Sequence, residues 1–122
     1  MPRSIRLALS ALAILGLVPG VASAHAFLDH ANPAVGSSLP ASPGSVRIWF
    51  TQALEPAFST IEVLDQNGKR VDADDVQVDA ADKTQLYATL KPLPPGVYKV
   101  FWRVVSVDTH ATEGKFTFDV GQ

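Results

Sequence analysis

Apolar side chains recur at every second position in several short runs of this chain, and this alternation constrains its fold more than any other feature. A period of two places alternate side chains on one face of an extended strand, which is typical of strands buried on one side. Trp49 falls on the outer face of its run, so we expect that face to be partly covered. Turn-forming pairs, Asn67-Gly68 and Pro95-Gly96, separate some of the runs, and no segment has a convincing helical period. The runs lie at 46–50, 61–63, 86–90, 98–104 and 116–120. The sequence therefore predicts an all-β domain of about seven strands, an immunoglobulin-like Greek-key β-sandwich or β-barrel.

Residues 1–24 have the order of regions found in a secretory signal peptide. Two arginines form a basic start, residues 7–18 are almost entirely apolar, and small side chains precede position 25. A retained membrane anchor is the alternative, but the apolar run is shorter than the roughly 20 residues that span a bilayer. We therefore expect cleavage after Ala24, which makes His25 the first residue of a mature domain that covers 25–122.

The expected mature chain contains no sulfur atom. The sequence has no cysteine, and its one methionine, Met1, lies in the expected signal peptide. Thiol chemistry and a Cu(I) site of thioether ligands are thereby excluded, so any metal site must use nitrogen and oxygen. Acidic residues outnumber basic ones, twelve to ten, which argues against binding to nucleic acid or to an anionic membrane surface. No second apolar span follows the signal, so we expect no membrane insertion of the mature chain.

The expected N-terminal residue, His25, offers two nitrogen ligands to one metal ion. A free α-amine and the imidazole Nδ1 can close a six-membered chelate, and both can lose their protons to a metal at neutral pH. In mid-chain the backbone nitrogen would be an amide, and this chelate would be lost. Asp108 and His110 stand two positions apart at the end of the longest run, where an extended chain points both side chains the same way and Thr109 away. Together these residues supply three nitrogens and one oxygen, a donor set that suits Cu(II).

Two other polar clusters have both a metal-binding and a plain structural interpretation. Asp29 and His30 form either a second, weak metal site or exposed polar residues at the end of a strand. The stretch 72–82 holds five aspartates, and it forms either a calcium site or a solvated loop. It lacks the glycine and the closing glutamate of an EF-hand loop. In both cases we favour the structural interpretation.

Several motifs follow one another along almost the whole expected mature chain. They are His25-Ala26 at the cleavage point and then "NPAVGSSL", "VRIWF", "PPGVYKVFWRVVSVDTH" and "EGKFTFDV". In residue content and order these motifs resemble the CopC family of exported bacterial copper-binding proteins. The resemblance implies a Greek-key β-barrel or sandwich, and one Cu(II) ion per chain held by His25, Asp108 and His110.

The chain departs from the CopC pattern in three respects. Phe27 stands where many members have a second histidine, and the methionine-rich Cu(I) site of some members cannot form. Gln52 stands where many members have a glutamate. If that acid orients the N-terminal amine, Gln52 can still hydrogen-bond but brings no charge, and Glu55 is a candidate to compensate.

Three functions are compatible with these features. The favoured one is a periplasmic Cu(II) carrier or buffer in copper homeostasis or resistance, a monomer without enzymatic activity that delivers copper to an inner-membrane transporter. A histidine-brace copper oxygenase is the second, because such enzymes also use an N-terminal histidine. Asp108 argues against it, since an anionic ligand favours Cu(II) over Cu(I) and hinders redox cycling. The third is a metal-free immunoglobulin-like interaction module, with Trp49, Tyr87 and Arg103 as interface residues.

Overall fold

Eight strands and one 3-10 turn make up the part of the chain that the computed structural model describes, residues 25–121. The prediction of a signal peptide at residues 1–24 lies outside the described residues. Across the described part, no helix is long and apolar enough to cross a membrane. The elements are β1 (Leu28–Asn32), β2 (Ser38–Leu39), β3 (Ser45–Phe50), η1 (Pro56–Phe58), β4 (Thr60–Leu64), β5 (Gln77–Val78), β6 (Gln85–Thr89), β7 (Gly96–Val105) and β8 (Ala111–Val120).

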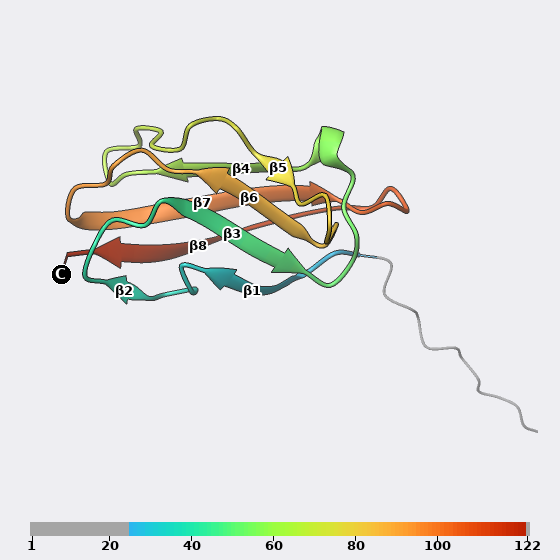
Figure 1. Ribbon diagram of the computed structural model, residues 1–122, viewed down its shortest axis with the longest axis horizontal. Coiled ribbons are helices and arrows are strands. Elements are labelled where there is room, and N and C mark those ends of the chain that lie inside the picture. Colours follow the sequence, from blue (N-terminus) through green and yellow to red (C-terminus); the bar gives the residue numbers. More distant parts are fainter. Residues whose placement is uncertain (1–24, 122) are drawn as a thin grey trace, which may run out of the picture.

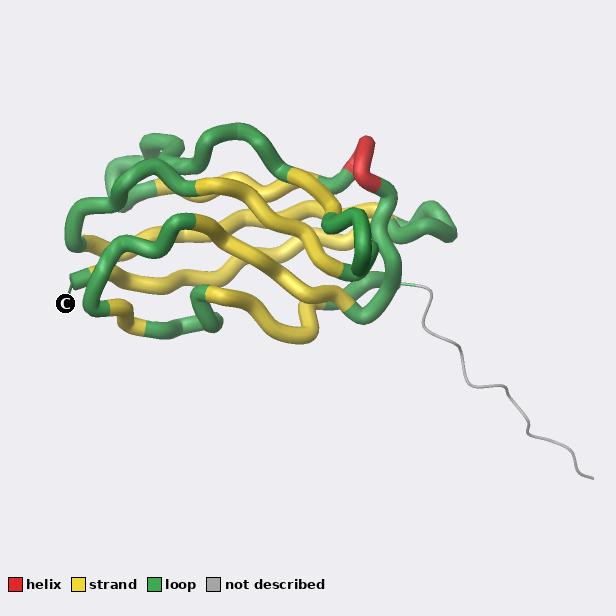
Figure 2. Tube along the Cα trace, viewed as in Figure 1, coloured by secondary structure: helices red, strands yellow, loops and turns green. Residues whose placement is uncertain are grey.

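The strands form two four-stranded sheets that lie one over the other (Figure 1, Figure 2). The N-terminal sheet has the strand order β1-β3-β6-β5, and all its neighbours are antiparallel. The C-terminal sheet has the order β2-β8-β7-β4, in which only the β2–β8 pair is parallel. Successive strands repeatedly cross from one sheet to the other. The all-β prediction is confirmed, and the presence of two separate sheets selects the sandwich over the closed barrel.

The predicted alternation places the apolar side chains between the sheets. In β3 the side chains of Val46, Ile48 and Phe50 are buried, and the residues between them face outward. In the long β7–β8 hairpin Trp102 lies directly opposite Gly114. A Cβ atom at Gly114 would stand 2.5 Å from Cζ2 of the Trp102 indole, so the ring occupies the space that a side chain would need. Because protein interiors are closely packed, a residue larger than glycine at position 114 would displace the Trp102 ring.

The outer face of the N-terminal sheet is partly covered, as predicted for Trp49. The His30 ring from β1 stacks on the Trp49 indole, with ring centroids 4.4 Å apart and an interplanar angle of 9°. Farther across the sheet, the Arg47 guanidinium lies 4.1 Å from the centre of the Tyr87 ring. Stacking and cation–π contacts thus cover aromatic surface that the core does not bury.

The edge of β4 is closed by the segment that returns after the Asn67-Gly68 turn. This turn forms as predicted, with Gly68 at a φ of 81°, where glycine is favoured. The chain then runs back so that the buried Asp72 carboxylate accepts a hydrogen bond from the Val63 amide, 2.8 Å away. Arg70 donates its Nε–H to the same carboxylate at 2.9 Å.

The expectation of a solvated acidic loop at 72–82 is therefore wrong at its first residue, because Asp72 is a buried structural anchor. Asp79 and Asp82 also make local hydrogen bonds: each accepts one from the backbone N–H of the residue two positions later, Ala81 and Thr84 respectively. These carboxylates are thus used to hold the connection in shape.

Candidate metal centre

The three predicted ligands lie at one end of the sandwich, where the β7–β8 turn meets the beginning of the described chain (Figure 1). The His25 and His110 rings are neighbours, with centroids 4.8 Å apart and an interplanar angle of 31°. Nδ1 of His110 lies 3.4 Å from Oδ1 of Asp108. The fold thus brings His25 to His110, and His110 to Asp108. β8 runs from this end to the opposite end of the sandwich.

A tight turn, and not an extended strand, brings Asp108 and His110 together. β7 ends at Val105, and the chain then folds back through hydrogen bonds from Thr109 N–H to Ser106 O (2.8 Å) and from Ser106 N–H to His110 O (3.0 Å). Thr109 has a φ of 73°, in the left-handed region that β-branched residues rarely adopt. The predicted extended geometry is therefore wrong, although the two side chains still lie together.

Ser106 links the two candidate ligands of this turn. It is 1% exposed, its hydroxyl donates a hydrogen bond to Oδ1 of Asp108, and its Oγ accepts the His110 N–H at 3.3 Å. The hydrogen bond from Ser106 is the largest influence and holds the pKa of Asp108 below its usual value, although desolvation opposes it; the interaction with His110 lowers this pKa further. Asp108 is thus an ionised carboxylate at neutral pH, able to act as an anionic ligand.

His25 is placed by the residue that follows it. Ala26 is fully buried in the core cluster, whereas His25 and Phe27 on either side of it are exposed. The His25 ring also lies near the Phe27 ring, with centroids 6.0 Å apart. The buried methyl group of Ala26 therefore anchors the chain one residue after the candidate chelating histidine.

The donor atoms at this end suit a borderline cation such as Cu(II). Two imidazoles and one carboxylate are available, and the His110 and Asp108 side chains are 51% and 47% exposed, so an ion can reach them. Among residues 25–121, no three His, Cys, Asp or Glu side chains are arranged to hold a metal by themselves. The structure thus brings the predicted ligands together in pairs, His25 with His110 and His110 with Asp108, and does not assemble all three around one point.

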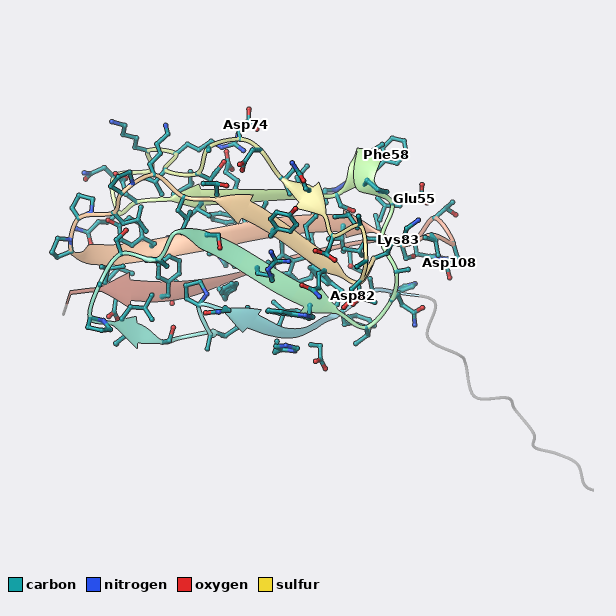
Figure 3. The ribbon with its side chains drawn as sticks, in the orientation of Figure 1. Glu55, Phe58, Asp74, Asp82, Lys83 and Asp108 are labelled. Atoms are coloured by element: carbon teal, nitrogen blue, oxygen red, sulfur yellow. The ribbon has the colours of Figure 1, made fainter. Side chains whose placement is uncertain are left out.

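The neighbouring polar residues of the prediction also belong to this end. Gln52 and Glu55 lie in the connection between β3 and η1, both partly buried, and the Glu55 N–H donates to Val105 O at 2.8 Å. Figure 3 shows Glu55 and Phe58 at the same end of the sandwich as Asp108. This connection is therefore joined to the end of β7, from which the ligand turn continues.

At the second candidate site, Asp29 and His30 form a pair that no third His, Cys, Asp or Glu among the described residues joins. Nδ1 of His30 lies 2.7 Å from Oδ2 of Asp29, and the His30 ring stacks on Trp49. Both residues are exposed and lie within β1, not at its end as we expected. The structural interpretation accounts for both residues.

The residues named for an interaction module do not share a face. Trp49 and Tyr87 project from the outer face of the N-terminal sheet, whereas Arg103 projects from the outer face of the C-terminal sheet. Arg103 there pairs with Glu113 at 3.6 Å and lines a groove of about 430 Å³ that contains none of the predicted metal ligands. A single interface cannot contain all three residues.

Sequence reasoning misses three hydroxyl side chains around the site. Ser106 could have been suspected, since a serine two positions before an aspartate often caps a turn. Thr51 and Thr112 bind the backbone of Ala26 and Phe27 from distant parts of the chain, and no local sequence pattern signals such contacts.

Comparison with known proteins gives one consistent family. Residues 28–121 match the CopC domain. Protein YobA of Escherichia coli K12 is 35% identical over 119 residues, which cover 97% of this chain and 95% of YobA. Copper transport protein CutJ of Bacillus subtilis is 33% identical over 112 residues, which cover 91% of this chain but 21% of CutJ.

Two solved structures share the fold and a substantial part of the sequence. CopC from Methylosinus trichosporium OB3b superposes with a TM-score of 0.74 and 38% identity, over 79% of this chain and 93% of that one. PcoC, a methionine-rich copper resistance protein from Escherichia coli, gives 0.71 and 32%, over 80% of this chain and 99% of that one.

Where these names state a role, it is copper resistance or copper transport, and none of them describes an enzyme. The predicted resemblance to the CopC family is thereby confirmed, and the relatives with a named role act in copper resistance or copper transport. The matched domain extends over most of the chain, and the two-sheet sandwich agrees with the solved structures. On sequence, fold and motif order alike, this chain belongs to the CopC family.

Proposed function

We propose that the mature protein is an exported, periplasmic carrier or buffer that binds one Cu(II) ion as its cargo. In this proposal the ion is held by His25, Asp108 and His110, which all lie at the same end of the sandwich. The observation that carries this proposal is the contact of the His25 and His110 rings, 4.8 Å apart, with the Asp108 carboxylate 3.4 Å from His110. Such a site at a chain end is open enough for an ion to enter and leave.

The ligands in this proposal are the α-amine and imidazole of His25, the imidazole of His110 and the carboxylate of Asp108. Three nitrogens and one oxygen suit Cu(II), and the absence of cysteine and of any methionine beyond Met1 argues against a second site for Cu(I). Both the amine and the imidazoles must be unprotonated to bind, so affinity falls as the solution becomes acidic.

Cleavage after Ala24 is part of the same proposal. The order of regions in residues 1–24 supports export, and small side chains precede the cleavage point. The buried Ala26 then leaves a single residue, His25, outside its anchor. Any longer N-terminus would convert the amine into an amide and remove one metal ligand.

The acceptor of the copper is, in this proposal, an inner-membrane copper transporter, to which the protein delivers the ion as a monomer. In CutJ, which is named a copper transport protein, the matched segment is 21% of a longer chain, so a domain of this kind occurs there joined to a larger part. Apolar side chains near the ligands suit such a contact: Phe27 and Val107 are 51% and 53% exposed, and Phe58 lies at the same end.

Calorimetric titration of Cu(II) into the mature protein, residues 25–122, tests the site. We expect one ion per chain, and a large loss of affinity for His110→Ala and for Asp108→Asn. His30→Ala is the matched control, because it removes an exposed histidine next to an aspartate elsewhere on the surface. Full affinity in His110→Ala, or loss of binding in His30→Ala, would exclude the proposed ligand set.

A further inference from the structure

One peptide group beside the candidate site is held from both of its sides. The Ala26 carbonyl accepts a hydrogen bond from the Thr112 hydroxyl at 2.5 Å, and the Phe27 N–H donates to Oγ1 of Thr51 at 2.9 Å. This carbonyl and this N–H belong to the same peptide unit. Thr112 lies in β8 of the C-terminal sheet, whereas Thr51 directly follows β3 of the N-terminal sheet. Two threonine hydroxyls, one from each sheet, thus clamp the peptide between them.

Further contacts fix the position of the clamped peptide along the chain. The Thr51 N–H donates back to the Phe27 carbonyl at 2.9 Å, and the Ala26 side chain is 0% exposed. A shift by one residue would move either an imidazole or a phenyl ring into the space that a methyl group fills. The number of residues between the clamp and His25 is therefore set by the structure.

Along the backbone, the clamped peptide unit lies one residue away from His25, a proposed metal ligand. Only the backbone bonds of Ala26 and His25 separate the fixed peptide unit from the imidazole and backbone nitrogen of His25. The first residues of a chain are usually poorly ordered unless they are tied down. Here the tie is made by two side-chain hydroxyls immediately before β1 begins at Leu28.

We propose that Thr112 and Thr51 are positioning residues for copper, which hold His25 against His110 before the ion arrives. The inference rests on the proposed function, since it assigns these hydroxyls a part in the same site. Neither hydroxyl needs to touch the ion. A ligand that is already ordered does not have to be ordered on binding, so preorganisation of this kind raises affinity without adding a contact to the ion.

The test uses Thr112→Val, which keeps the shape of the side chain and removes the hydroxyl. We expect the mature protein with this change to bind Cu(II) roughly threefold to tenfold more weakly, the loss that corresponds to one net hydrogen bond. Thr112→Ser restores the hydroxyl and should restore the affinity. Thr117→Val is the matched control, because Thr117 is an exposed threonine on the same strand. Thr51→Val should resemble Thr112→Val.

A second measurement follows the clamp without copper. Hydrogen exchange of the Phe27 amide in the metal-free protein should be faster in Thr51→Val and Thr112→Val than in the wild type and in Thr117→Val. Wild-type affinity and unchanged Phe27 exchange in both clamp variants would overturn the inference and leave the proposed function standing. Equal weakening in Thr117→Val would also overturn it, since the effect would then reflect β8 in general. Failure of the wild type itself to bind Cu(II) would overturn the proposed function, and this inference with it.

Discussion

Replacing Asp72 by asparagine should destabilise the mature domain by about 3 kcal/mol. The Asp72 side chain is fully buried, and its oxygens accept hydrogen bonds from the Val63 amide (2.8 Å), the Asp74 amide (2.9 Å) and Nε of Arg70 (2.9 Å). An asparagine side chain has one acceptor oxygen and one donor nitrogen, so at least one of these donors would face another donor. An unsatisfied buried donor costs about 1–3 kcal/mol, and removing one partner of a buried ion pair costs about 3–5 kcal/mol. Because Arg70 is itself 40% exposed, we expect a loss near the lower limit of the ion-pair range, about 3 kcal/mol.

The effect should depend on pH in a defined direction. Burial alone would raise the pKa of Asp72, but the hydrogen bonds from Arg70 and from the Val63 and Asp74 amides outweigh it and hold this pKa below its usual value. The stability that the carboxylate contributes is fully present above the pKa of an unfolded aspartate, about 4, and is lost as the pH falls through the lower pKa of the folded state. The difference between wild type and Asp72→Asn should thus be complete at pH 7 and shrink below about pH 4.

Urea unfolding followed by tryptophan fluorescence measures this difference. Asp74→Asn is the control, because the Asp74 side chain is 79% exposed and makes one ion pair with Arg70, at 3.1 Å; Figure 3 shows it away from the end that carries Asp108. The Asp74→Asn substitution should lower the free energy of unfolding by less than about 1 kcal/mol. Equal unfolding midpoints for wild type and Asp72→Asn at pH 7, or a difference that grows in acid, would refute the reasoning.

Two further predictions concern the hairpin of β7 and β8. Gly114→Ala should lower the free energy of unfolding by about 1–3 kcal/mol and alter the near-UV circular dichroism, because the new methyl group would meet the Trp102 indole. Gly44→Ala is the control and should change the free energy of unfolding little, because the space around its Cβ position is open. Equal effects of the two substitutions would contradict this explanation. Ser106→Ala should raise the pKa of Asp108 toward its usual value, since it removes the strongest hydrogen bond to that carboxylate. An NMR titration of the metal-free protein measures that pKa, and an unchanged value would count against the role of Ser106.

The strands of the core could be predicted because period-two alternation is a direct consequence of strand geometry. The runs at 46–50, 86–90 and 98–104 coincide closely with β3, β6 and the centre of β7. β2 and β5 could not be predicted, since two residues are too few to show a period. The choice between sandwich and barrel depends on which strand edges pair, and that information is not present in the alternation within any single strand.

For the candidate site, the residue types could be predicted but their geometry could not. Asp108 and His110 stand out as metal ligands by their chemistry. Their convergence depends on a left-handed Thr109, which nothing in the local sequence favours because β-branched residues avoid that conformation. The clamp by Thr51 and Thr112 is a tertiary contact between segments that only the complete fold brings together.

The most direct measurement of the central claim compares Cu(II) affinity in two proteins that differ by one residue. One begins at His25, and the other carries a single additional alanine before it. If the α-amine of His25 is a ligand, the extended protein should bind Cu(II) far more weakly at neutral pH, because the amine has become an amide. Equal affinity of the two proteins would contradict the account, whatever the affinity of the side-chain ligands.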